Sequence, residues 1–94
     1  MSISHNSYHG GRLQSLGFVT VDGKPATVGI ALPGEYDFGP ADRKETVTVT
    51  SGAIIPIGRS DTTAERTKTG LIFMEGTPIS FRCNEPTTFI CVYE

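Results

Sequence analysis

The chain has 94 residues, which is enough for one domain over residues 1–94 with a thin core. Its 8 Lys and Arg against 10 Asp and Glu leave a formal net charge of −2, which argues against nucleic-acid binding, since that requires a concentrated basic face. No apolar run approaches the ~20 residues of a membrane-spanning helix, and the polar N-terminus lacks the pattern of a signal peptide, so we expect a cytoplasmic protein without membrane contact.

Short β-branched runs bounded by turn residues follow one another along the chain, which predicts an all-β fold. The first runs predict strands over residues 13–21, 26–32, 34–38 and 46–52. The later runs predict strands over residues 53–58, 64–69, 71–75, 79–83 and 87–93, with a polar hairpin loop at 60–65. Asp22 and Gly23 predict a hairpin turn. Pro56 cannot donate to a strand ladder and therefore marks an edge or a bulge.

The last strand is apolar on both faces, with Phe89, Cys91 and Tyr93 on one side and Ile90 and Val92 on the other. Such a strand fits a sandwich, or one wall of a barrel covered by a second subunit. Eight or nine short strands without a helix predict a jelly roll or closed barrel. The thin core adds to the expectation of a homodimer. The two cysteines are too few for a disulfide framework and are expected to be free thiols.

Glu45 lies seven residues before Gly52, the spacing at which the first motif of metal-binding cupins places its Glu and Gly. The segment that should carry two histidines reads FGPAD (38–42), and Phe81 stands at the third histidine position. Histidine supplies most nitrogen ligands of such sites, and the only two, His5 and His9, are predicted to lie in a solvated tail. We therefore expect a cupin-like double-stranded β-helix without a metal. A metal cupin that uses a tail histidine stays as an alternative.

Several stretches in order resemble one family along nearly the whole chain: SLGF (15–18), GKPATVGIALPGEYDF (23–38), ETVTVTSGA (45–53), EGT (75–77) and EPTTFICVY (85–93). They resemble the small cupin-fold pyrimidine/purine nucleoside phosphorylases. The resemblance implies a cytosolic homodimer without cofactor. It also implies phosphate-dependent cleavage of purine and pyrimidine nucleosides to free base and pentose 1-phosphate. The chain departs from the family pattern at Val92, where a basic residue is common.

Phosphorolysis requires acceptors for the ribose hydroxyls that also tolerate positive charge at the sugar, as carboxylates do in glycoside hydrolysis. Glu45 and Glu35 are the predicted catalytic carboxylates. A broad range of bases favours stacking on aromatic rings, because every base has a π-face. The predicted substrate-binding residues are therefore the aromatic and hydroxyl side chains on the motif strands, namely Tyr36, Phe38, Thr50, Ser51, Phe81 and Tyr93.

Three basic residues are the predicted phosphate ligands: Arg82, Lys24 and Arg12. Arg82 has the opposite strand parity to Phe81, so both face one pocket only if a bulge intervenes. Backbone N–H groups beside Gly52 offer another anion site. A non-catalytic barrel that binds a small ligand is the second hypothesis for the function, favoured by the missing basic residue next to Tyr93.

Overall fold

The structure, a computed structural model, describes residues 2–57, 65–66 and 70–94. These residues form an all-β fold, as predicted, with one short 3₁₀ turn, η1 (His9–Gly11). The strands are β1 (Ser4–Tyr8), β2 (Leu13–Val19), β3 (Pro25–Ala31), β4 (Gly34–Pro40), β5 (Glu45–Ser51), β6 (Ile55–Pro56), β7 (Glu65–Arg66), β8 (Gly70–Phe73), β9 (Pro78–Cys83) and β10 (Thr87–Tyr93). Within the described ranges, no helix has the length and apolar character needed to cross a membrane.

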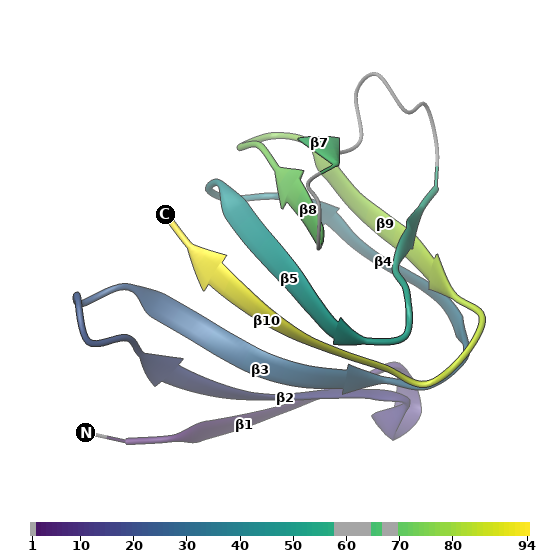
Figure 1. Ribbon diagram of the computed structural model, residues 1–94, viewed down its shortest axis with the longest axis horizontal. Helices are drawn as coiled ribbons and strands as arrows, with labels where there is room; N and C mark the ends of the chain where they lie inside the picture. Colours follow the sequence, from purple (N-terminus) through teal and green to yellow (C-terminus); the bar gives the residue numbers. More distant parts are fainter. Residues whose placement is uncertain (1, 58–64, 67–69) are drawn as a thin grey trace.

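The strands form two antiparallel sheets that face each other and do not close into one barrel. The larger sheet has the order β1-β2-β3-β10-β5-β8-β7, and the smaller has the order β4-β9-β6. Figure 1 shows the larger sheet fanning from β1 to β8 and the pair β4 and β9 on the other side. The short link from β9 to β10 passes from the smaller sheet to the larger, so these two strands are neighbours in sequence but belong to different sheets.

The N-terminal segment is a strand, and the prediction of a solvated tail was wrong. β1 pairs with β2 along its whole length, from Ser4 opposite Gly17 to Tyr8 opposite Leu13. Its sequence SHNSY has no β-branched residue, so the intrinsic preference for a strand is weak and the pairing with β2 decides. Both histidine side chains of the segment are still exposed to solvent.

The predicted turn and edge positions are confirmed. Gly23 adopts φ 87°, where glycine carries no steric cost, and its N–H donates to the carbonyl of Thr20 at 3.0 Å. Pro56 lies in β6, an edge strand of the smaller sheet. Most of the predicted loop at 60–65 and strand at 64–69 lie outside the described residues.

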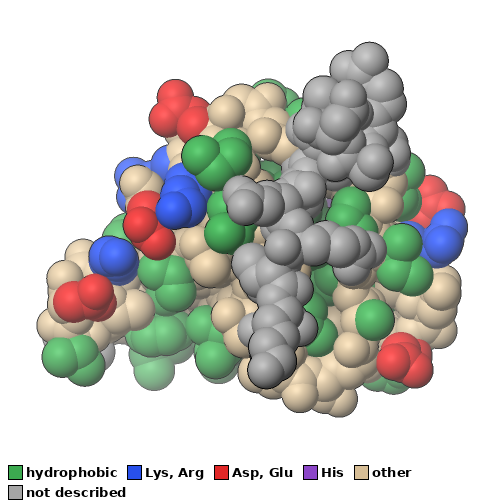
Figure 2. Space-filling model, turned by 45° about the horizontal axis from the view of Figure 1, so that its top comes forward, with side chains coloured by type: hydrophobic (Ala, Val, Ile, Leu, Met, Phe, Trp, Pro, Cys, Tyr) green, Lys and Arg blue, Asp and Glu red, His purple; other side chains and the backbone are tan. Residues whose placement is uncertain are grey.

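The core lies between the two sheets. Its largest fully buried side chains are Tyr36 and Cys83 from the smaller sheet and Phe73, Leu71 and Thr87 from the larger. Both cysteines are free and buried, as predicted. The outer face of the larger sheet leaves apolar side chains partly in solvent: Leu16, Val28, Ile30 and Ile90. Figure 2 shows Lys, Arg, Asp and Glu side chains interspersed at both margins of the visible face, so neither sign of charge dominates there.

Candidate functional site

A cavity of about 320 Å³ lies between the sheets. This is at the lower end of the volumes found for small-molecule sites. The larger sheet supplies most of its wall: Leu13, Ser15, Thr27, Glu45, Val47, Phe73, Phe89, Cys91 and Tyr93. The opposite wall comes from β4 and β9, with Phe38, Pro40, Ile79 and Phe81. Four of the predicted site residues therefore line one cavity: Glu45, Phe38, Phe81 and Tyr93.

Glu45 is a half-buried carboxyl group in the cavity lining. It begins β5, and its register partners are Tyr93 on β10 and Phe73 on β8, so rings flank it on both sides. The Cys91 thiol donates a hydrogen bond to Glu45 Oε1 at 3.6 Å. Burial raises the pKa of Glu45, and the nearby Asp42 charge adds to this, while the thiol hydrogen bond acts in the opposite direction.

The thiol of Cys91 and the hydroxyl of Tyr93, both beside Glu45, are neutral at neutral pH. Burial raises the pKa of the Cys91 thiol to about 12, with a further contribution from the Glu45 charge. Burial likewise raises the pKa of Tyr93, whose hydroxyl lies 3.4 Å from Thr27 Oγ1. Tyr93 and Thr27 thus offer hydroxyl groups, while the thiol and the rings keep water away from Glu45.

An aromatic wall faces this polar end. The rings of Phe38 and Phe81 are stacked with centroids 6.1 Å apart and 23° between their planes. Tyr8 packs edge-on against Phe38 at 5.2 Å. Phe38 is 37% exposed, so it lies at the mouth of the cavity, whereas Phe81 is buried within it. Flat apolar rings of this kind can hold bases of different sizes.

Tyr36 belongs to the core, not to the cavity lining. Its side chain is 1% exposed, and its hydroxyl donates to the carbonyl of Leu32 at 2.6 Å and to that of Arg12 at 3.2 Å. Its ring packs against Phe81 at 5.5 Å. Tyr36 therefore supports a cavity-lining ring from behind.

Glu35 and Arg82 lie on the outer side of the smaller sheet. They are register partners, next to the inward-facing pair Tyr36 and Phe81. Both are exposed. Successive strand residues face opposite sides, and between positions 34 and 37 the pairing of β4 with β9 continues without a bulge. Arg82 and Phe81 therefore face opposite sides of the smaller sheet, as their neighbouring positions in the strand predict.

Thr50 and Ser51 also lie away from the cavity. The Thr50 hydroxyl is 2.6 Å from that of Thr88, in a shallow apolar groove on the outer face of the larger sheet. Ser51 ends β5 and is exposed. In the turn that follows, the Ala53 N–H donates to the hydroxyl of Thr87, so this amide is already used.

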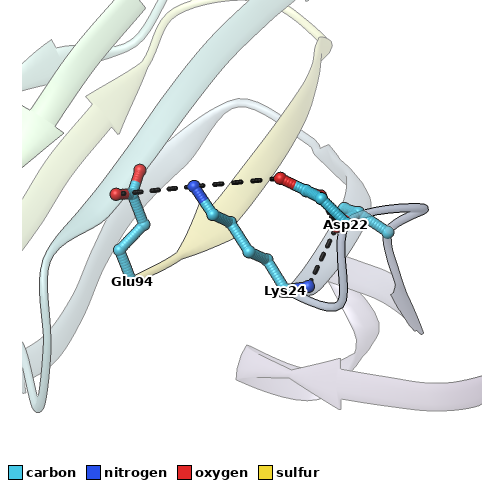
Figure 3. A network of polar contacts seen from close by, with 4 residues as sticks. Asp22, Lys24 and Glu94 are labelled. Carbon is cyan, nitrogen blue, oxygen red and sulfur yellow. Dashed lines mark hydrogen bonds and ion pairs between the residues drawn. The ribbon is translucent and has the colours of Figure 1, made fainter.

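The predicted cations lie outside the cavity lining. The Arg12 guanidinium donates to the carbonyl of Pro33. Lys24 Nζ lies 3.7 Å from Glu94 Oε2 and 4.0 Å from Asp22 Oδ2, and Figure 3 shows Lys24 between these two carboxylates. Glu94 directly follows the cavity-lining residue Tyr93 in the chain. Among the described lining residues, the charged side chains are all carboxylates.

Asp42, Tyr8, Ser15, Thr27 and Phe89 line the cavity but were not predicted as site residues. The sequence could have indicated Asp42, because it stands in the segment where the cupin motif places inward-facing ligands. The other four residues reach the cavity only through the pairing of strands that are distant in the sequence.

The two histidines do not line the cavity. His5 is 2.9 Å from the side-chain oxygen of Gln14, and His9 packs edge-on against Tyr36 and Phe38. In the described part of the chain, no three His, Cys, Asp or Glu side chains are grouped so as to hold a metal ion.

A family model described as pyrimidine/purine nucleoside phosphorylase matches residues 3–93. The chain belongs to this family. It is 34% identical to a pyrimidine/purine nucleoside phosphorylase of Vibrio parahaemolyticus and 36% identical to one of Vibrio campbellii, in each case over 99% of both chains.

Solved structures show the same fold. A protein of unknown function from Vibrio parahaemolyticus aligns over 100% of both chains with a TM-score of 0.67 and 28% identity. One from Acinetobacter sp. ADP1 aligns over 97% of this chain and 90% of its own, with a TM-score of 0.74 and 21% identity. The two-sheet fold is thus shared with proteins of low sequence identity.

Proposed function

We propose that this protein transfers the pentose of purine and pyrimidine nucleosides to inorganic phosphate, releasing free base and pentose 1-phosphate. The observation that carries the proposal is the cavity itself, in which a half-buried carboxyl group faces a wall of aromatic rings. Membership of the nucleoside phosphorylase family over residues 3–93 supports it. No cofactor enters the proposed reaction.

In the proposed complex, the base stacks on Phe38 and Phe81 and the sugar lies at the opposite end. The hydroxyls of Tyr93 and Thr27 form hydrogen bonds with the ribose, and Glu45 faces the bond that joins the sugar to the base. We assign the second carboxylate to Asp42 in place of Glu35, because Asp42 lines the cavity and Glu35 faces outward.

We propose Lys24 as the phosphate ligand, because it pairs with Glu94, which directly follows the cavity-lining residue Tyr93. Lys24→Met is then expected to raise the KM for phosphate about tenfold or more, as expected for the loss of a charge-assisted hydrogen bond. Arg82→Met, on the outer face, is the matched control and should leave this KM unchanged. Equal effects of the two variants would rule out Lys24.

The decisive experiment follows base release from a panel of nucleosides, with and without phosphate, by chromatography. Phosphate-dependent release from both a purine and a pyrimidine nucleoside is the expected result. No release from any nucleoside, at high enzyme concentration and long times, would refute the proposal. Nucleoside binding without phosphate-dependent turnover would instead select a non-catalytic ligand-binding barrel.

We further propose that the two sheets are opposite walls of a cupin-like jelly roll, and that the protein is a cytoplasmic homodimer. The exposed apolar side chains Leu16, Val28, Ile30 and Ile90 on the outer face of the larger sheet support a second copy there. Light scattering at micromolar concentration should give the mass of a dimer, and Ile30→Asp should shift it toward the monomer. A monomeric wild type would contradict the proposed assembly.

A further inference from the structure

We propose that the two carboxyl groups of the cavity divide the chemistry between them: Glu45 donates the proton that the departing base takes up, and Asp42 supplies the negative charge that stabilises the sugar. This inference rests on the proposed nucleoside phosphorylase function and assigns the roles within the same site.

The two carboxyl groups share a cavity but differ in their surroundings. Glu45 is half-buried between the rings of Phe73 and Tyr93, and the Cys91 thiol holds one of its oxygens. Asp42, three residues earlier, lines the same cavity but is exposed. A carboxylate in contact with water keeps its charge readily, whereas one enclosed by rings does not.

Three ionisable groups face Glu45 from the described elements packed around it: Asp42 on the chain before β5, and Cys91 and Tyr93 on β10. Its neighbour on β8, Phe73, carries no charge. Burial is the largest influence and raises the pKa of Glu45, the Asp42 charge acts in the same direction, and the thiol hydrogen bond opposes both. Glu45 therefore keeps its proton to a higher pH than an exposed carboxyl group, as a proton donor near neutrality requires.

The proposed step is balanced without any further reactant. The bond between sugar C1′ and the base nitrogen breaks, and its electron pair leaves with the base. The Glu45 proton passes to a ring nitrogen or carbonyl oxygen of the base, while a phosphate oxygen bonds to C1′. The proton of hydrogen phosphate then restores Glu45. Positive charge develops at the sugar during this step, and the Asp42 carboxylate stabilises it, as carboxylates do at glycosidic centres.

Substrates that differ in their need for a proton separate the two roles. The bases of inosine and uridine must take up a proton as they leave. The base of 7-methylguanosine already carries a positive charge and leaves without taking up a proton. Glu45→Gln should lower kcat/KM by about 10²–10⁴-fold on inosine and uridine, but by less than about tenfold on 7-methylguanosine. Asp42→Asn should lower kcat/KM by similar factors on all three. Glu75→Gln, at an exposed position away from the cavity, is the matched control.

An equal loss on all three substrates in Glu45→Gln would overturn the division of roles, even though the protein is a phosphorylase. A second readout needs no turnover: the carboxyl carbon of Glu45 is followed by NMR against pH and identified by its absence in Glu45→Gln. Its midpoint should lie above the ordinary range of a glutamate carboxyl group and fall in Asp42→Asn. A midpoint within or below that ordinary range would also overturn the inference, whether or not any nucleoside is cleaved.

Discussion

The ring of Phe89, which lines the cavity, leaves no room for a side chain at Gly29, and replacing this glycine by alanine tests the packing directly. The two residues are register partners on β3 and β10. A Cβ atom at position 29 would lie 2.5 Å from Phe89 Cζ and 2.8 Å from Cε2, whereas carbon atoms pack at about 3.5–4.0 Å. The ring must therefore move, and because it lines the cavity it moves into the space that we assign to the nucleoside.

Overpacking of this kind costs about 1–3 kcal/mol of the free energy of unfolding. Since one methylene in an apolar pocket changes binding about tenfold or more, the KM for nucleosides should rise by at least that factor. Urea unfolding measures the first effect, and steady-state kinetics measures the second.

The control is the same substitution in a Phe89→Ala background, which removes the ring. There Gly29→Ala should cost nothing or stabilise by about 0.5 kcal/mol, because alanine loses less backbone entropy on folding than glycine does. A coupling energy of about 1 kcal/mol or more between the two positions is expected. If Gly29→Ala costs the same in both backgrounds, the steric explanation is wrong.

Three further predictions concern stability. Thr87→Val should cost about 1–3 kcal/mol by urea unfolding, because its fully buried hydroxyl bonds both the N–H and the carbonyl of Ala53; Thr48→Val, at an exposed position, should be nearly neutral. Tyr36→Phe should cost about 1 kcal/mol through its lost hydrogen bonds and leave the KM for nucleosides unchanged; a large change in KM would place Tyr36 in the binding site. Glu45→Gln should become progressively more stable than the wild type as pH rises above the ordinary carboxyl range. There the raised pKa of Glu45 means that the native state binds more protons than the unfolded state, so the wild type loses stability; parallel pH profiles of unfolding would contradict this.

The positions of the strands were predictable from local sequence. Turn residues such as Asp22 and Gly23 and the alternating runs beside them marked most strands, because turn chemistry and a period of two act over a few residues. β1 was missed because its residues have weak strand preference and only its pairing with β2 holds it.

The composition of the site was only partly predictable. Glu45 and Phe81 were found through motif spacing, and both line the cavity. Motif spacing did not show which of Glu35 and Asp42 faces the cavity, because the face that a residue occupies depends on which side of its sheet is covered. The Asp42 side chain borders the cavity, whereas the strand parity of Glu35 directs it outward.

The sequence by itself determined that this chain is all-β, that its thiols are free, and that it carries the motifs of its family, since these properties reside in residue types and short spacings. Only the tertiary structure decided which side chains surround the cavity and that the predicted cations lie outside its lining. That outcome depends on pairing between strands far apart in the chain, such as β5 with β10, whose register no local pattern specifies.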